Sequence, residues 1–354
     1  MKKLFVGVLC VALSLSVQGK EVNMTSPDGK YQFTLSDSGG QLHYSLTWNG
    51  KQTVKPSLLG INANVEWRDG VEIGTVDSSR KDTIWHPVYG ERSEIKDCYH
   101  AWKIVVNRQN GRDKLILDVR AYDEGIAFRY HFPGGQYLKI TDEYTEYTMP
   151  EGTKAYFTPK AQTPYSYLPL ENWPGESDRP LLLTLADGGY VCLAEAQVVD
   201  YVRTKFNVSP TKKNTVISAM YGPVEDIAPY STPWRVIMCA DKPGEILEHN
   251  DILLNLNPPC RIKDTSWIKP GKVMREVTLT TEGGKALVDF AVKRNLQYIH
   301  FDAGWYGFEY DKASDATTVT LDPRRNPKID ALNLKEVVAY AKQHGIGVIL
   351  YVNQ

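Results

Sequence analysis

Gln297-Tyr298-Ile299-His300-Phe301-Asp302-Ala303-Gly304-Trp305 is a short apolar stretch that ends abruptly in an acid, a glycine and a tryptophan. A run of this length without a break is typical of a strand that is buried in a parallel sheet. The segment just before it, residues 285–294, has apolar residues at helical spacing. The sequence therefore predicts a helix that leads into a buried strand and a sharp turn at Gly304.

The same pattern repeats downstream. Asn333 is expected to start a second helix, with Glu336 able to complete a capping box. Its expected apolar face is formed by Leu334, Val337, Val338 and Ala341. Gly345 supplies the stop, and residues 347–352 are nearly all apolar, as expected of a strand buried on both faces.

Helix, strand, loop, helix and strand in this order predict the first part of a (β/α)₈ barrel. Such a barrel needs roughly 250 residues, and fewer than half of these follow Trp267. We therefore expect the barrel to be incomplete at Gln354, only two strands into the domain. The alternative is a small, complete β-α-β appendage, which would leave both faces of its strand pair exposed.

Residues 22–256 have a different pattern, in which short alternating strands are separated by Gly, Pro, Asn and Asp. Trp48-Asn49-Gly50-Lys51 predicts a tight hairpin turn. Many short strands of this kind predict a β-sandwich. The expected strands span residues 31–35, 41–48, 114–121, 126–132, 155–158, 190–195, 215–219 and 234–239.

The N-terminus predicts export. Met1-Lys2-Lys3 is basic, residues 4–17 are apolar, and Val17-Gln18-Gly19 offers small or apolar residues for cleavage. The alternative, a membrane anchor, needs roughly 20 apolar residues. We expect a signal peptide over 1–19, a sandwich domain over 20–265 and the start of a barrel over 266–354. The mature protein would be periplasmic or secreted, without a membrane segment.

The net charge, the aromatic content and the absence of certain motifs limit the ligands and reactions to be expected. Loss of Lys2 and Lys3 changes the formal net charge from −1 to −3, which gives no reason to expect binding to nucleic acid. The chain has 21 Tyr and 8 Trp, which fits stacking on sugar rings but also fits a sandwich core. No P-loop, Gly-x-Ser-x-Gly or His-Glu-x-x-His motif is present in the sequence. The four cysteines of the mature chain could be buried thiols or disulfides: Cys98, Cys192, Cys239 and Cys260.

Four residues are candidates for a site. Asp302 follows a strand directly, where residues of a barrel line the active site, and Trp305 could stack on a sugar. Asn353 holds the same place on the next strand. These roles compete with simpler ones, since Asp302 could cap a loop, Trp305 could pack on the rim, and Asn353 could satisfy backbone groups. Glu195 ends an apolar strand and could bind Ca²⁺, although one carboxylate is no evidence by itself.

Several of these motifs together resemble glycoside hydrolase family 97, a family of exported α-glucosidases and α-galactosidases. They are Ser266-Trp267-Ile268-Lys269-Pro270-Gly271-Lys272, then Asp302-x-Gly304-Trp305, the segment 123–130, and Cys192-Leu193-Ala194-Glu195. The resemblance implies a β-super-sandwich followed by a (β/α)₈ barrel, with calcium in the active site. It makes Glu195 a calcium ligand and Asp302 and Trp305 pocket residues. Residues 273–277 depart from the tryptophan-rich strand of many members.

The resulting hypothesis is an exo-acting α-glycosidase that hydrolyses α-galactosides or α-glucosides, with an oligosaccharide as substrate and a monomer as the working form. By the same resemblance, the catalytic acid and the nucleophile or base are missing from this chain, so we expect the chain itself to be inactive. The alternative hypothesis is a non-catalytic carbohydrate-binding β-sandwich, which would bind sugar upstream of Trp267.

Overall fold

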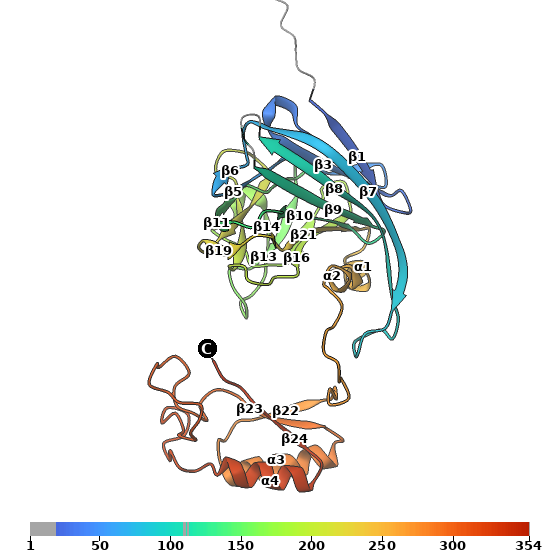
Figure 1. Cartoon of the computed structure of the whole chain (residues 1–354). Helices are drawn as coiled ribbons and strands as arrows, with labels where there is room; N and C mark the ends of the chain where they lie inside the picture. The colour runs from blue at the N-terminus through green and yellow to red at the C-terminus, as the bar shows by residue number, and fades with distance from the viewer. Residues whose placement is uncertain (1–18, 109–110, 112, 354) are drawn as a thin grey trace, which may run out of the picture. The chain divides into compact units, whose positions relative to one another are not determined.

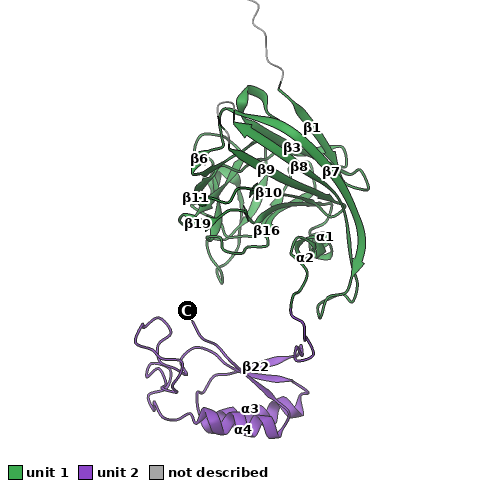
Figure 2. Ribbon diagram, viewed as in Figure 1, with its two compact units in different colours: residues 1–261 green, residues 262–354 purple. Residues whose placement is uncertain are grey.

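The computed structural model describes residues 19–108, 111 and 113–353. The chain divides into two compact units, Met1–Arg261 (unit 1) and Ile262–Gln354 (unit 2) (Figure 2). The predicted junction at residues 265 and 266 lies just inside unit 2. The predicted signal peptide lies outside the described residues, apart from Gly19. None of the described helices is long and apolar enough to cross a membrane.

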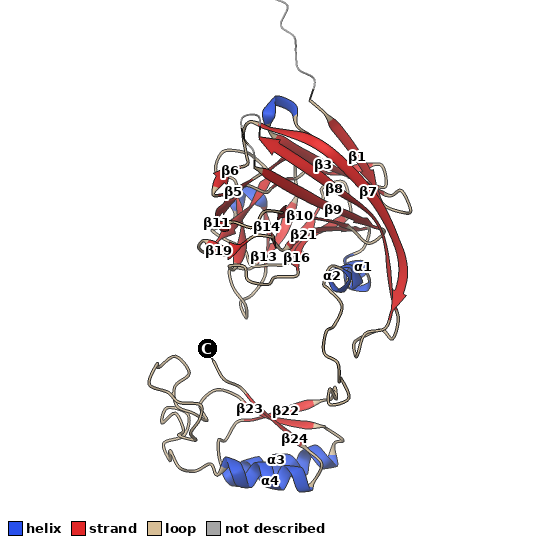
Figure 3. Ribbon diagram, viewed as in Figure 1, coloured by secondary structure: helices blue, strands red, loops and turns tan. Residues whose placement is uncertain are grey.

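Unit 1 consists almost entirely of antiparallel strands (Figures 1 and 3). The first sheet has seven strands, in the order β1 (Glu21–Thr25), β2 (Tyr31–Ser36), β3 (Leu42–Trp48), β4 (Lys51–Leu59), β12 (Glu146–Thr148), β18 (Thr215–Met220) and β17 (Thr204–Val208). A small third sheet has the order β19 (Val224–Ile227), β11 (Tyr137–Glu143), β5 (Ile61–Ala63) and β6 (Val65–Glu66).

The second sheet has ten strands. Its order is β14 (Ser166–Pro169), β13 (Lys154–Phe157), β15 (Leu181–Thr184), β16 (Tyr190–Ala196), β21 (Trp234–Ala240), β10 (Ile126–Phe132), β9 (Lys114–Tyr122), β8 (Ile95–Arg108) and β7 (Val71–Trp85), with β20 (Tyr230–Ser231) paired to β10. The described helices of unit 1 are short: η1 (Ser38–Gly40), η2 (Leu170–Asn172), α1 (Pro243–Glu248) and α2 (Asp251–Asn255).

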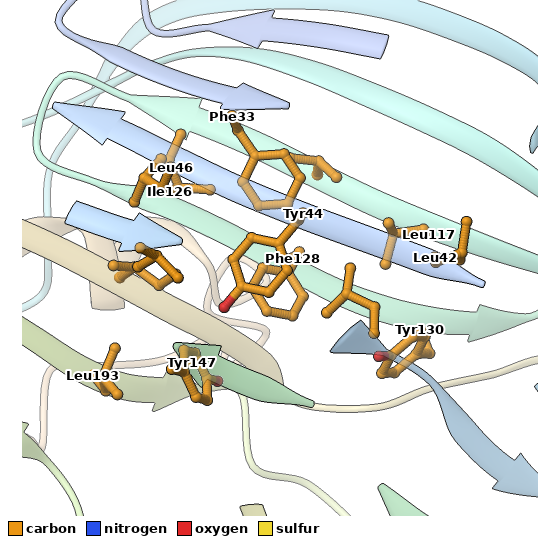
Figure 4. Close-up of a cluster of buried hydrophobic side chains, with 14 of the residues drawn as sticks. Phe33, Leu42, Tyr44, Leu46, Leu117, Ile126, Phe128, Tyr130, Tyr147 and Leu193 are labelled. Carbon is orange, nitrogen blue, oxygen red and sulfur yellow. The ribbon is translucent and has the colours of Figure 1, made fainter. Parts of the chain in front are cut away.

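An aromatic core joins the two large sheets (Figure 4). Phe33 on β2 stacks on Tyr44 of β3 with the ring centroids 5.1 Å apart. Tyr44 in turn contacts Phe128, on β10 of the second sheet, at 5.4 Å. All three side chains are buried, as the alternation of the strands requires. Two sheets packed through such a core form the predicted β-sandwich.

The predicted hairpin at residues 48–51 is confirmed, because Trp48 pairs with Lys51 and both turn residues have positive φ, 50° for Asn49 and 76° for Gly50. Two of the longest strands, β7 and β8, were not predicted. The outer part of β7 is exposed on nearly every residue, so it lacks the apolar alternation that marks a half-buried strand. Pairing with β8 along residues 71–85 defines it instead.

The four cysteines of the described chain are free thiols. Burial raises the pKa of Cys192 and that of Cys239 to about 12 each. Both thiols therefore stay protonated and behave as small apolar side chains.

Unit 2 is a three-stranded parallel sheet covered by two helices. Its strands run in sequence order, β22 (Val273–Glu276), β23 (Tyr298–Phe301) and β24 (Gly347–Leu350), and are connected through α3 (Thr281–Lys293) and α4 (Leu334–Gln343). The sequence pattern predicted only two of these strands, at residues 297–301 and 347–352. The third, β22, lies in the segment where the sequence departs from the tryptophan-rich strand of the resembled family.

Three details of unit 2 differ from prediction. Val338 on α4 is 41% exposed, so the buried stripe of that helix is Leu334, Val337 and Ala341. Only half of the capping box forms, because Glu336 N–H donates to Asn333 Oδ1 (3.2 Å) while the Glu336 carboxylate accepts from the Asn333 side chain. Strand β24 is not buried on both faces: its last residues, Ile349 and Leu350, are about two-fifths exposed because it is the edge strand.

Candidate functional site

Asp302 lies at the carboxyl end of β23, the middle strand of unit 2. One of its carboxylate oxygens forms an ion pair with Arg275 Nη1 at a distance of 2.9 Å. The Asp302 side chain is 27% exposed and that of Arg275 is 49% exposed. The arginine comes from β22, which pairs in parallel with β23. Two neighbouring strands thus hold a partly open carboxylate at the strand ends of the sheet.

Gly304 and Trp305 form the turn after this strand. Gly304 has φ +101°, and a Cβ there would lie 2.5 Å from the Arg325 side chain, so the predicted sharp turn requires glycine. Trp305 is 4% exposed, and its indole N–H donates to the Tyr351 carbonyl at 2.8 Å. Its ring is part of the core of unit 2, which leaves little of its face for a sugar.

Asn353 follows β24 and contacts the loop after β23. Its backbone N–H donates to the Tyr306 hydroxyl at 2.8 Å, and its side-chain amide donates to the Glu309 carbonyl at 3.1 Å. Asp302, Trp305 and Asn353 therefore belong to one end of the same sheet. Of the three, Asp302 is the residue whose charged group is held open to a ligand.

Glu276 is a strand-end acid that was not among the predicted site residues. It ends β22 and is 4% exposed. Its carboxylate accepts hydrogen bonds from Thr278 N–H (2.8 Å), the Thr278 hydroxyl (2.5 Å) and Leu279 N–H (2.7 Å). An acid at the end of a short strand was the signal that could have found it. Since its oxygens bind the loop, Glu276 anchors the turn rather than a ligand.

Glu195 lies in unit 1, near the end of β16, where it pairs in register with Arg235 of β21. Its Oε2 accepts from Arg235 Nη1 at 2.6 Å and from the Thr204 hydroxyl at 3.1 Å. Arg179 Nε is 3.7 Å from the same oxygen. The Glu195 side chain is 19% exposed, so it is the outermost member of a buried polar cluster.

The centre of this cluster is Arg235, which is 1% exposed. Its Nε donates to Glu143 Oε1 at 2.8 Å and its Nη2 to Glu143 Oε2 at 2.5 Å, a two-pronged pair. Burial alone would raise the pKa of Glu143, but the charge of Arg235 and its hydrogen bonds outweigh burial and hold that pKa at about 2. Glu143 is therefore ionised throughout the neutral range.

Arg179 completes the cluster. It lies over the Phe206 ring at 3.8 Å, and its Nη2 donates to the Ser218 hydroxyl at 3.1 Å. Its Nε and Nη1 are buried without a hydrogen-bond partner in the described part of the chain. Burial and the charge of Arg235 lower its pKa. No sequence motif pointed to Arg179, Arg235 or Glu143, because they come from a loop before β15 and from β21 and β11, which meet only in the folded chain.

The described residues do not form a calcium site by themselves. No three acidic, histidine or cysteine side chains among them come together in a geometry that could hold a metal ion. Glu195 offers one carboxylate, but one of its oxygens accepts from Arg235 and lies near Arg179, whose positive charges disfavour a nearby cation. Calcium takes six to eight oxygen ligands, so further donors would have to come from outside this cluster.

Known proteins resemble the chain over almost its full length. It is 26% identical to a retaining alpha-galactosidase of Bacteroides thetaiotaomicron, over 99% of this chain and 58% of that protein. It is 25% identical to a probable retaining alpha-galactosidase of Streptomyces bingchenggensis, over 93% of this chain and 51% of that protein. The chain thus spans about half the length of the curated relatives it matches.

Solved structures have the same fold. A glycoside hydrolase family 97 enzyme from Pseudoalteromonas sp. strain K8, in complex with panose, has a TM-score of 0.82 and 23% identity, over 92% of this chain and 53% of that one. A structure of a family 97 enzyme from the same strain in complex with acarbose gives the same TM-score, identity and coverage. The family model for the glycosyl-hydrolase 97 N-terminal domain matches residues 24–259. The chain therefore belongs to glycoside hydrolase family 97, as its motifs suggested.

Proposed function

We propose that the protein to which this chain belongs is an exported retaining α-glycosidase that acts on α-galactosides. Family membership supports glycoside hydrolysis, and both curated relatives described above are named retaining alpha-galactosidases. Panose and acarbose in the related structures support an oligosaccharide as the substrate. We also propose that unit 2 belongs to a (β/α)₈ barrel, because its parallel strands follow one another in sequence order.

The observation that carries the proposal is the position of Asp302. It stands at the carboxyl end of a parallel strand, where a barrel enzyme places the groups that contact its substrate. Arg275 holds one carboxylate oxygen, and the other has no hydrogen bond from the described residues. That free oxygen is suited to accept hydrogen bonds from the hydroxyl groups of a sugar.

Hydrolysis with retention needs two carboxyl groups about 5–5.5 Å apart, one as acid and one as nucleophile. Glu276 has both oxygens engaged by its loop, so Asp302 is the one partly open carboxylate described at the ends of β22, β23 and β24. We therefore assign Asp302 to substrate binding, and we assign neither catalytic carboxyl group to the described residues.

The proposal is tested by expressing the complete reading frame that encodes this chain. The product is expected to hydrolyse p-nitrophenyl α-D-galactopyranoside with a higher kcat/KM than p-nitrophenyl α-D-glucopyranoside. The 354-residue chain serves as the matched control and is expected to release no nitrophenol above background. Turnover by the chain alone, or none of either substrate by the complete product, would contradict the proposal.

We carry the calcium role of Glu195 as a proposal for the complete protein, in which further donors join it. Replacement of Glu195 by Gln keeps the shape and removes the charge, so calcium affinity is expected to fall roughly tenfold or more. Titration calorimetry with CaCl₂ measures the change. Glu151→Gln, at an exposed turn of the same unit, is the control, and an unchanged affinity for Glu195→Gln would remove Glu195 from the ligand set.

Export and a monomeric state are also proposals. N-terminal sequencing of the protein from the cell envelope should begin at Lys20 if the signal peptide is cleaved after Gly19. Sedimentation of the purified protein should give the mass of one chain. An intact Met1 would contradict cleavage of a signal peptide. The mass of a dimer would contradict the monomeric state.

A further inference from the structure

Unit 1 contains a second candidate site, away from the Glu195 cluster. It is a cavity of about 800 Å³, lined by residues of the ten-stranded sheet, including its β7–β8 hairpin, and by residues 254–260 of α2 and the segment that follows it. Trp234 lines this cavity, whereas its neighbour Arg235 is bonded to Glu195. Because adjacent residues of a strand point to opposite faces, the cavity and the Glu195 cluster lie on opposite faces of β21. We call this cavity the hairpin pocket.

Aromatic rings and guanidinium groups alternate in the wall of the hairpin pocket. Arg120 lies over Trp234 at 4.8 Å and over Tyr99 at 4.7 Å, and Arg129 lies over the Trp234 ring at 4.3 Å. Trp85 is fixed by a hydrogen bond from its indole N–H to Asn255 Oδ1 at 2.8 Å. The wall therefore combines guanidinium groups that lie over aromatic rings, the fixed ring of Trp85 and several side-chain amide groups.

The charges in this wall do not cancel. Lys81 is paired with Asp97 at 2.6 Å, and Arg129 is paired with Asp118 at 3.0 Å. Arg120 has no carboxylate partner among the described residues, and its one side-chain hydrogen bond there goes to the Tyr122 hydroxyl at 3.4 Å. One positive charge is thus left in a partly buried wall, where an anion would be stabilised.

Two polar atoms in the same wall lack partners among the described residues. Asp97 Oδ1 and Trp234 Nε1 are both buried without a hydrogen bond, and the two residues are 5% and 1% exposed. Leaving such a group unpaired costs about 1–3 kcal/mol. Each such group calls for an explanation, and a ligand or an ordered water would supply the missing hydrogen bonds.

We propose that the hairpin pocket binds a saccharide that carries a carboxylate, that is, a hexuronate unit of an oligosaccharide. The cavity volume lies in the range of small-molecule sites. The half-buried ring of Trp85 suits a pyranose ring, and the guanidinium of Arg120 suits a carboxylate through two parallel hydrogen bonds. The formal net charge of the chain is −1, so a general attraction for anions does not explain such binding. This site is independent of the proposed hydrolytic activity.

The test uses the 354-residue chain and measures the binding of α-1,4-linked digalacturonate by titration calorimetry and tryptophan fluorescence. The same disaccharide with methyl-esterified carboxyl groups is the matched neutral probe, and sodium acetate is the anion without a sugar ring. We expect digalacturonate to bind, its methyl ester to bind at least about tenfold more weakly, and acetate to leave the fluorescence unchanged.

Variants test whether digalacturonate binds in the hairpin pocket. Arg120→Gln is expected to reduce the affinity for digalacturonate at least about tenfold, and Arg120→Lys to give an intermediate value. Arg80→Gln, an exposed arginine on β7, removes the same charge outside the pocket and should leave binding unchanged. The proposal is overturned if digalacturonate does not bind at millimolar concentration, if its ester or acetate binds equally well, or if Arg80→Gln weakens binding as much as Arg120→Gln. If Arg120→Gln does not fold, Arg120→Lys and the ester comparison decide the question.

Discussion

Replacement of Arg235 by Met is expected to destabilise unit 1 by about 3–5 kcal/mol, the usual cost of removing one partner of a buried ion pair. Glu143 is fully buried and receives two hydrogen bonds from Arg235. Without the arginine, its carboxylate would have to stay charged in an apolar interior or take up a proton. Glu195 would lose its shortest hydrogen bond at the same time. Urea unfolding, followed by tryptophan fluorescence, measures the loss.

Two further variants separate the lost pair from a general packing defect. In the double variant Arg235→Met with Glu143→Gln the buried carboxylate that Arg235 neutralised is removed as well, so it should be more stable than Arg235→Met alone. Arg68→Met removes an exposed pair with Asp69 in the same unit and should cost less than about 1 kcal/mol. A loss for Arg235→Met no larger than that for Arg68→Met would contradict the account of the cluster.

The Glu143–Arg235 pair also makes the folding stability of unit 1 depend on pH. The folded pKa of Glu143 is about 2, below its value in an unfolded chain, so folding favours the ionised form. Its contribution, on the order of 3 kcal/mol, is present at neutral pH and is lost as the pH falls from about 5 towards 2. Glu143→Gln cannot titrate, so its stability should fall less over this range than that of the unchanged protein.

Replacement of Asp302 by Asn in the complete protein is expected to lower kcat/KM for p-nitrophenyl α-galactoside by roughly 10- to 100-fold. This corresponds to about 1.5–3 kcal/mol, the value of hydrogen bonds made by a charged group. The change also removes the pair with Arg275, but an exposed pair contributes at most about 1 kcal/mol to stability. The thermal midpoint should therefore move little while the activity falls.

Asp330→Asn is the matched control, because Asp330 is an exposed acid of the same unit and the change in charge is identical. It should retain the activity of the unchanged protein. If Asp302→Asn and Asp330→Asn were equally active, Asp302 would have no role in substrate binding and would only cap its loop.

Local patterns were enough to predict much of the fold. Strand β10 has the predicted bounds, residues 126–132, because its apolar residues and its turns both mark its ends. The helix stop at Gly345 was also predictable, since the residue has φ +69°. The outer part of β7 was not, because its residues are polar and only its partner β8 defines it.

Prediction of the candidate sites is limited in the same way, because local patterns do not reveal contacts between distant segments. Asp302 could be found because a single chain segment contains both the strand and the acid that follows it. The Glu143–Arg235–Glu195 cluster joins three strands that are far apart in sequence, and nothing in each segment alone marks its partner. The hairpin pocket likewise depends on Trp234 and Arg120 meeting across β21, β10 and β9. Such contacts follow from strand order, which the periodicity of a sequence does not specify.

Hydrolysis of methyl α-D-galactopyranoside by the protein from the complete reading frame, followed by proton NMR from the first minutes, tests the central claim most directly. The predicted result is galactose release in which the α-anomer forms first and then equilibrates to the β-anomer, as retention requires. Release of β-galactose first, or no release of galactose, would contradict the proposal that the complete protein is a retaining α-galactosidase.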